Sequence, residues 1–142
     1  MSINDTKEVT CPNCGQKQEQ VIHSSINVTL NPELKQDLFD GTINRFECKY
    51  CAHNSVIPVP LLYHDMDREF AVHYFSKESI KKEDFLDKFD SDGNMIVEKD
   101  KIDYSPPDYL YDVHIVFSMD EMLNYIVFRE YLFDFHDKKD SN

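Results

Sequence analysis

Positively charged residues are scarce in this 142-residue sequence. It contains 15 Lys and Arg against 27 Asp and Glu, which gives a formal net charge of -12. Residues 1–62 contain five basic and seven acidic side chains, whereas residues 63–142 contain ten and twenty. Binding to DNA or RNA depends largely on neutralising phosphates with Lys and Arg. The composition therefore argues against a broad nucleic-acid-binding surface.

Long hydrophobic runs are also missing. The most apolar stretch, residues 123–135, is interrupted by Arg129, Glu130 and Asp134, and it is shorter than the roughly 20 apolar residues that cross a bilayer. The N-terminal MSINDTKEVT lacks the basic segment and apolar run of a signal peptide. We therefore expect no membrane span and a cytoplasmic location.

Motifs of common catalytic sites are absent as well. There is no G-x-S-x-G, P-loop or H-E-x-x-H sequence. DSDGN at 90–94 does not fit a calcium loop, because Lys88 and Lys99 would occupy the first and last ligand positions. We expect a non-enzymatic protein. An enzyme is the alternative, and it would need a pocket in which His73 or His114 meets several carboxylates.

Only four cysteines are present, and they form two Cys-x-x-Cys pairs: Cys11 with Cys14, and Cys48 with Cys51. Two such turns facing each other supply the tetrahedral four-thiolate shell that Zn2+ accepts at about 2.3 Å per bond. Two disulfides or a redox pair are the competing interpretations. A reducing cytoplasm keeps thiols free, and a redox site has no use for a second pair. We predict one structural Zn2+, whose closed shell leaves no position for catalysis.

The residues beside the cysteines suit this site. Gly15 can adopt the conformation that turns backbone N–H groups toward sulfur. Four thiolates around a dication carry a net charge of -2, so we expect Lys17 and Lys49 to compensate it in the second shell. His23 and His53 could replace a cysteine ligand, but with four thiols available we expect them to be ordinary polar residues.

Hydrophobic alternation predicts three strands, at residues 20–30, 68–75 and 109–117. In the first, Ile22, Ile26, Val28 and Leu30 would share one face. In the last, Tyr109, Tyr111, Val113, Ile115 and Phe117 would share one face. Residues 55–64 contain Pro58 and Pro60, which lack N–H donors, so this segment is expected at a sheet edge if it is a strand.

Three helices are predicted. Residues 31–41 have Asn31 as a possible cap and Leu34 and Leu38 on the inner side, and residues 76–90 have Phe85, Leu86 and Phe89 on one side. Ser118 and Glu121 form a capping box that opens a helix reaching about His136, followed by a frayed tail. Residues 90–108 are expected to form a loop or a weak hairpin.

The two cysteine pairs, the segment NVTLNPELKQDLFDGTINRFECKYC and the following VIPVPLLYHD resemble the CpXC family, prokaryotic proteins named for paired cysteine motifs. The second pair here reads Cys-Lys-Tyr-Cys, without the proline. The resemblance implies a zinc-ribbon-like element joined to an α+β remainder, and no particular reaction. It implies a single domain over residues 1–142, with a ribbon-like part at 8–62 and an acidic part at 63–138.

The expected fold is thus α+β, with zinc-ribbon-like knuckles on a small antiparallel sheet and about three helices. The last helix is apolar on most sides, so it either lies in the core or contacts another chain. We expect a protein partner or a homodimer. The alternative is a nucleic-acid-associated factor in transcription or translation, which needs Lys17, Lys35, Arg45 and Lys49 on one face.

Overall fold

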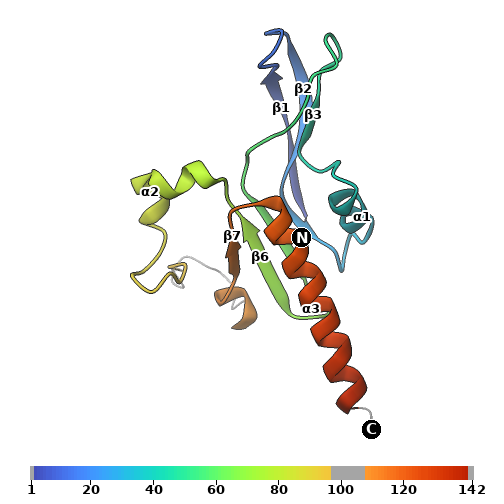
Figure 1. Ribbon diagram of the computed structural model, residues 1–142, viewed down its shortest axis with the longest axis vertical. Helices are drawn as coiled ribbons and strands as arrows, with labels where there is room; N and C mark the ends of the chain where they lie inside the picture. The colour runs from blue at the N-terminus through green and yellow to red at the C-terminus, as the bar shows by residue number, and fades with distance from the viewer. Residues whose placement is uncertain (1, 97–107, 141–142) are drawn as a thin grey trace.

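A five-stranded sheet lies at the centre of the fold (Figure 1). The computed structural model describes residues 2–96 and 108–140. Within them the strand order is β1-β2-β5-β6-β7. The pairs β1–β2 and β5–β6 are antiparallel, whereas β2–β5 and β6–β7 are parallel. The strands are β1 (Ile3–Thr10), β2 (Lys17–Asn27), β5 (Leu61–Asp65), β6 (Phe70–Tyr74) and β7 (His114–Val116).

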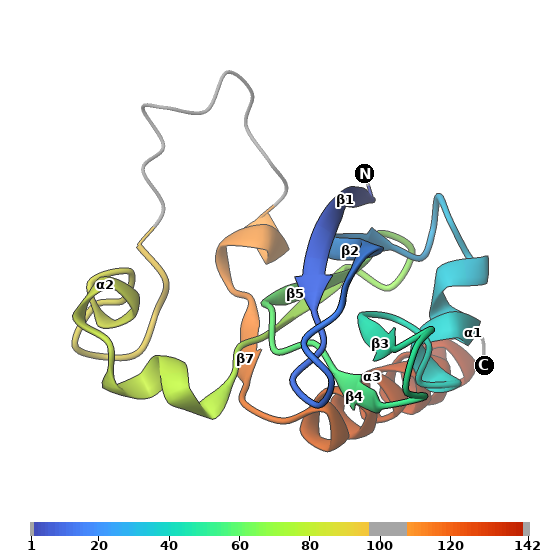
Figure 2. The same ribbon diagram turned by 90° about the horizontal axis from the view of Figure 1, so that it is seen from above.

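Two short strands and three α-helices complete the described residues. β3 (Arg45–Glu47) and β4 (Asn54–Val56) form a separate antiparallel ribbon. The helices are α1 (Glu33–Phe39), α2 (Glu83–Leu86) and the long C-terminal α3 (Met119–Asp140). Figure 2 shows α2 beyond β7, at the opposite end of the sheet from β1. The predicted α+β class with a long last helix is confirmed, although the sheet is mixed rather than antiparallel.

One hydrophobic core joins the first and second halves of the chain. The helix α1 packs against β2, and α3 packs against β6 and β7. The buried members of the core are Ile26, Val28, Leu38, Ile43, Leu61, Tyr63, Phe70, Val72, Val116, Met122 and Ile126. The proposed division between residues 62 and 63 falls inside β5. The acidic part is therefore bound to the first part by a shared strand and a shared core.

The helix α3 begins as the sequence predicts. The hydroxyl of Ser118 accepts a hydrogen bond from the N–H of Glu121 at 3.1 Å, and the Glu121 carboxylate accepts one from the N–H of Phe117 at 3.2 Å. This reciprocal cap satisfies N–H groups that a helix leaves without partners. The helix continues to Asp140, so residues 137–140 are helical where a frayed tail was predicted. Within the described residues, no helix combines the length and apolarity needed to cross a bilayer.

Two strand predictions need correction. No strand was predicted at residues 3–10, yet they form β1, the sheet edge. In β2 the one-sided alternation is wrong, because Ser25, Ile26 and Asn27 are all buried and Leu30 is exposed. The cause is tertiary: this end of β2 lies between β1 and β5, and an interior strand covered on both faces loses its alternation.

The predicted strand 109–117 is confirmed only at His114–Val116, because Asp108–Tyr111 forms a 3-10 turn. Val116, which is not on the face shared by the five alternating residues, is buried in the core with Met122 and Ile126 of α3. On the other face Phe117 contacts Phe85, with ring centres 6.1 Å apart. Side chains on both faces of this segment therefore contact other parts of the protein. For that reason the alternation of residues could not indicate which face packs against the core.

The predicted helix 76–90 is divided. A 3-10 turn spans Lys77–Lys81, and the extended backbone of Lys82 separates it from α2. Phe85 is buried, with its ring centre 4.8 Å from that of Phe75, whereas Leu86 is exposed. Phe85 also lies 5.0 Å from Phe89, ring centre to ring centre. Aromatic packing rather than a continuous helix holds this segment.

Turn residues behave partly as predicted. Pro58 and Pro60 lie between β4 and β5, and β5 occupies the middle of the sheet rather than an edge. The helix α1 starts after Pro32 without a side-chain cap, so Asn31 does not cap it, although Leu38 is buried as expected. In the DSDGN turn the Asp90 carboxylate accepts hydrogen bonds from the N–H groups of residues 92 and 94. Of the predicted loop 90–108, residues 97–107 lie outside the described residues.

Candidate metal site

The two cysteine turns have the same backbone geometry. In each, the N–H of the first cysteine donates to a carbonyl five residues later, and the residue after the second cysteine donates back to the carbonyl of the first. That following residue has a left-handed φ, +77° at Gly15 and +63° at Ala52. The four bonds are Cys11 N to Gln16 O, 2.8 Å; Gly15 N to Cys11 O, 3.0 Å; Cys48 N to His53 O, 2.8 Å; and Ala52 N to Cys48 O, 3.1 Å.

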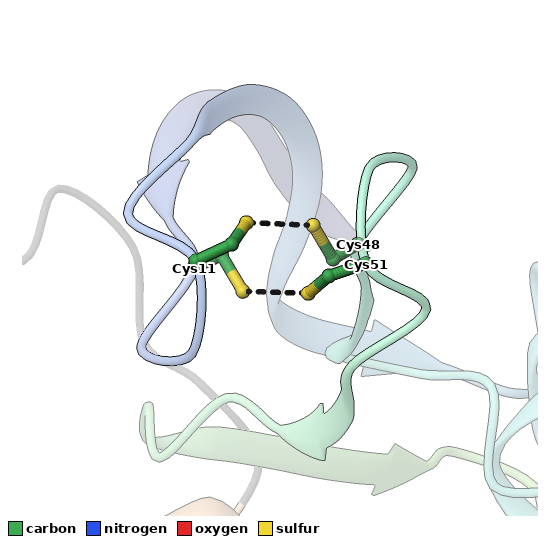
Figure 3. A group of neighbouring side chains, drawn as sticks. Cys11, Cys48 and Cys51 are labelled. Atoms are coloured by element: carbon green, nitrogen blue, oxygen red, sulfur yellow. Dashed lines mark hydrogen bonds between the residues drawn. The ribbon is translucent and has the colours of Figure 1, made fainter.

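These turns bring the four thiols together. The first connects β1 to β2 and the second connects β3 to β4, and Figure 3 shows their sulfurs facing each other across the gap. Sγ of Cys11 lies 3.6 Å from Sγ of Cys51, and Sγ of Cys14 lies 3.5 Å from Sγ of Cys48. All four sulfurs are within 4.8 Å of one another. The cysteines are free thiols.

This spacing fits one metal ion. A tetrahedron with metal–sulfur bonds of about 2.3 Å has sulfur–sulfur edges of about 3.8 Å. The shortest observed separations, 3.5 and 3.6 Å, are slightly below that value, whereas a disulfide would require about 2.05 Å. Each turn supplies two sulfurs, so a single ion would connect the β1–β2 hairpin to the β3–β4 ribbon.

The thiols ionise unequally when no cation neutralises them. The side-chain amide of Asn13 and then the backbone N–H of His53 lower the pKa of Cys51 to about 6. At Cys14 a backbone hydrogen bond from Gln16 acts to lower the pKa, but desolvation and the three neighbouring thiols raise it to about 12. Adjacent thiolates repel each other, so one negative charge opposes the next. A bound cation removes this conflict and allows all four thiols to ionise.

Hydrogen-bond donors to sulfur come from residues that the sequence reasoning did not identify. Nδ2 of Asn13 lies 3.4 Å from Sγ of Cys51, and the backbone N–H of Tyr50 lies 3.4 Å from Sγ of Cys48. Asn13 lies between the first two cysteines, and Tyr50 lies between the second two. Position within the motif was therefore an available signal, since such donors offset thiolate charge.

The predicted second-shell residues contribute differently. Gly15 does supply the left-handed turn, but its N–H donates to the Cys11 carbonyl rather than to sulfur. The Lys17 ammonium lies 3.7 Å from the Glu8 carboxylate. Lys49 contributes its backbone N–H, which donates to Oε1 of Gln18. The two lysine side chains are thus not seen to contact sulfur within the described residues.

A small apolar cluster supports the site. Its buried members are Cys11, Phe46 and Cys48, and Val9, Cys51 and Ile57 pack against it. Phe46 is in β3, so its ring fills the space between the ribbon and the hairpin. The histidines His23 and His53 lie outside the group of four thiols. With only one large apolar side chain buried, this cluster offers little hydrophobic stabilisation of its own.

The other sequence candidates do not form one site. Lys35 pairs with Glu130 on α3, and Lys17 pairs with Glu8. Arg45 and Lys49 line the same surface hollow, together with Glu19 and Glu47. The four cations needed for a nucleic-acid surface are therefore divided, and acidic side chains accompany each group.

His73 and His114 lie on neighbouring strands but on opposite faces of the sheet. Val72, not His73, pairs with His114, and successive side chains of a strand alternate. His114 stacks on Tyr125 of α3, with ring centres 3.9 Å apart. His73 lines a hollow of about 410 Å³ in which the described lining contains no Asp or Glu. The pocket of histidines and carboxylates that an enzyme would need is not formed by these residues.

The fold and the thiol group define an α+β protein with a four-cysteine, ribbon-like site. A CpXC protein family model matches residues 9–134, which include all four cysteines, and the chain belongs to that family. No curated protein and no solved structure matches it. The recognition made from the cysteine pairs is thereby confirmed.

Proposed function

We propose that this protein is a non-enzymatic cytoplasmic interaction module whose ribbon end is organised by one structural Zn2+. The observation that carries the proposal is the convergence of four sulfurs within 4.8 Å. The donor set is all thiolate, which suits Zn2+ in a closed tetrahedral site. With every coordination position taken by protein, the ion would stabilise structure and would not activate water.

The energetic role of the ion follows from the small cluster around it. Structural zinc sites have apparent binding free energies of about 10–16 kcal/mol that are coupled to folding. The cluster around Phe46 contains few apolar groups. Metal binding would therefore replace the hydrophobic core that this end lacks and would hold β3–β4 against the β1–β2 hairpin.

The inference of an interaction role rests on the surface. The second half of the chain is acidic, with twenty acidic against ten basic residues, and apolar side chains of α3 are exposed. Contiguous exposed apolar side chains are typical of contacts with another protein, and aromatic residues are enriched in such interfaces. The nucleic-acid alternative has less support, because Lys17 and Lys35 are paired with carboxylates.

Elemental analysis of the native protein tests the metal. We expect one zinc per chain, and Cys48→Ser should abolish stoichiometric binding. The matched control is Ser55→Ala in the neighbouring strand β4, which should retain the metal. Iron in place of zinc would show that the structural ion is iron and not Zn2+. The absence of both metals from native protein would contradict the proposal.

A finer comparison tests which residues support the thiolates. Asn13→Ala removes the amide donor to Cys51, so we expect zinc affinity to fall by about 10- to 100-fold. Lys49→Met should change it little, because only the backbone of Lys49 is used. Competition with a chromophoric chelator measures both. A larger loss for Lys49→Met than for Asn13→Ala would restore the charge-compensation hypothesis.

A further inference from the structure

The outward face of α3 carries a row of aromatic side chains. Met122 and Ile126 are fully buried against the sheet. On the opposite side of the helix, Phe128 is 56% exposed, Tyr131 is 74% exposed and Phe135 is 59% exposed. Their spacings of three and four residues place them on one stripe. Three aromatic rings in a row on a solvent-facing stripe are costly to leave in water.

The position of this stripe leaves it open to a partner. Figure 1 shows that the last turns of α3 extend past the end of β6. The same view places the connection between β1 and β2, where the first thiol turn lies, at the other end of the long axis. A contact along the outward face of α3 would therefore leave the first thiol turn of the same molecule uncovered.

Charge along α3 specifies which partner fits. The first turn contains Asp120 and Glu121, and the last turn contains Lys138 and Lys139. If a second α3 lies antiparallel across the first, with the two-fold axis between positions 129 and 130, Asp120 is opposite Lys139 and Glu121 is opposite Lys138. A parallel arrangement would instead place Asp120 and Glu121 opposite the same acidic residues of the other copy, and Lys138 and Lys139 opposite the same lysines.

The same register pairs two of the three aromatic residues across the interface, while Phe135 lies opposite Asn124. Phe128 of one copy lies opposite Tyr131 of the other, and each pair occurs twice because the contact is two-fold symmetric. Antiparallel helices also oppose their macrodipoles favourably. The Phe128–Tyr131 pairs, the charges at the two helix ends and the helix direction thus agree on one self-complementary arrangement.

We propose that a second copy of this chain packs antiparallel on the Phe128–Tyr131–Phe135 stripe, forming a homodimer. This inference rests on the proposed interaction function and names its partner. An aromatic residue buries about 150–250 Å² when covered, so the three exposed rings offer roughly 400 Å² per copy. This is below the roughly 800 Å² per partner of a standard interface. The dimer should therefore be reversible and concentration-dependent.

Sedimentation velocity on the metal-loaded full-length protein, from micromolar to millimolar concentration, tests the dimer. We expect a monomer–dimer equilibrium that Tyr131→Glu weakens by tenfold or more. The matched control is Leu86→Glu, which charges an exposed leucine on α2 instead and should leave the equilibrium unchanged. Circular dichroism verifies that each variant keeps its helix content.

Charge exchange tests the direction of packing. Asp120→Lys alone and Lys139→Asp alone should each weaken the homodimer, because each places like charges opposite one another. A one-to-one mixture of the two variants should restore association, since both charge pairs are then complementary. In a parallel arrangement like charges already face each other in the unmodified homodimer, so neither single variant would weaken association further; that result would overturn the antiparallel arrangement.

The metal content of the same samples separates this inference from the proposed function. A strict monomer at millimolar concentration that retains one zinc per chain would overturn the homodimer and leave the zinc-organised module standing. A dimer unaffected by Tyr131→Glu would place the interface elsewhere and would also overturn it. Protein without metal would contradict the proposed function itself.

Discussion

The two ends of this molecule are held together by different physical means. At the sheet, eleven buried residues from both halves of the chain form one core, to which the strands and the helices α1 and α3 all contribute. At the ribbon end, the buried cluster formed by the described residues contains only Cys11, Phe46 and Cys48. The first region buries enough apolar surface to stabilise itself, whereas the second concentrates four thiols that repel one another once they ionise. The difference teaches that burial alone does not account for the ribbon, and under the proposed function a bound ion would supply the stabilisation that hydrophobic burial does not.

Removing the metal should produce the largest difference in stability between the ribbon end and the sheet. On chelation we expect the amides of β3–β4 and of both cysteine turns to lose protection from hydrogen exchange, because the local cluster cannot replace the zinc–thiolate bonds. The amides of β5 and β6 should keep their protection. Hydrogen exchange followed by mass spectrometry measures both regions at once. Loss of protection throughout the sheet would show that the two ends unfold as one unit.

A cavity in the main core should produce the reverse pattern. Ile126 is fully buried beneath the sheet, so Ile126→Ala should lower the free energy of unfolding by about 2–5 kcal/mol. Ile126→Val is the graded control, with an expected loss of about 0.5–1.5 kcal/mol. Denaturant titration measures the stability, and chelator competition should show unchanged zinc affinity. A parallel loss of zinc affinity would mean that the core transmits its packing to the thiol site.

Acid should weaken the sheet through His73. Burial, and to a lesser degree the positive charge of Lys88, lower the pKa of His73 to about 4 in the folded protein. The unfolded chain binds this proton near pH 6.5. The unfolded state therefore carries more protons between pH 6.5 and pH 4. The free energy of unfolding thus decreases as the pH is lowered through that window, by up to about 3 kcal/mol.

The difference between unmodified protein and His73→Gln isolates this effect. Protonation of the cysteines and carboxylates affects both proteins and cancels in the comparison. Unfolding free energies measured at several pH values should show a smaller acid loss for His73→Gln. Identical slopes for the two proteins would exclude His73 as the source.

The smallest predicted effects come from substitutions at Gly15 and Ala52, the equivalent positions of the two cysteine turns. Ala52 has a left-handed φ of +63° that glycine adopts without strain. Ala52→Gly should therefore stabilise the ribbon by about 0.5–1 kcal/mol, and Gly15→Ala should destabilise it by a similar amount. A Cβ at Gly15 would meet no atom within 4 Å, so the cost comes from the backbone alone.

Chelator competition should rank zinc affinity as Ala52→Gly above unmodified protein above Gly15→Ala. The control is Gly93→Ala, which has a left-handed φ of +90° but lies in the turn after α2. It should leave the metal affinity unchanged. Equal effects of Gly15→Ala and Gly93→Ala on zinc affinity would contradict a local origin.

Sequence reasoning succeeded where the signal is local. The spacing of Cys11, Cys14, Cys48 and Cys51 predicted their convergence, because a Cys-x-x-Cys turn fixes two sulfurs within four residues. The capping box of Ser118 and Glu121 likewise needs only one helical turn. These features depend on short-range backbone geometry, which composition and spacing encode directly.

It failed where the outcome depends on what covers a strand. The alternation at residues 109–117 did not single out Val116, which is buried in the core with residues of α3, and β2 ends in three consecutive buried residues. The placement of β5 in the centre of the sheet after two prolines has the same cause. Asn13 was missed as a donor to the sulfur of Cys51 because that cysteine belongs to the partner turn, 38 residues away, whereas the Tyr50 N–H donates within its own turn.

The sequence by itself determined the chemistry of the protein: four thiols in two matching turns, an acidic second half and a capped C-terminal helix. Tertiary structure alone decided that β2 and β5 pair in parallel, that the two parts share one core, and that Phe128, Tyr131 and Phe135 remain exposed. The physical reason is that spacing along a chain fixes nearby geometry, whereas burial is set by contacts between segments that are distant in sequence.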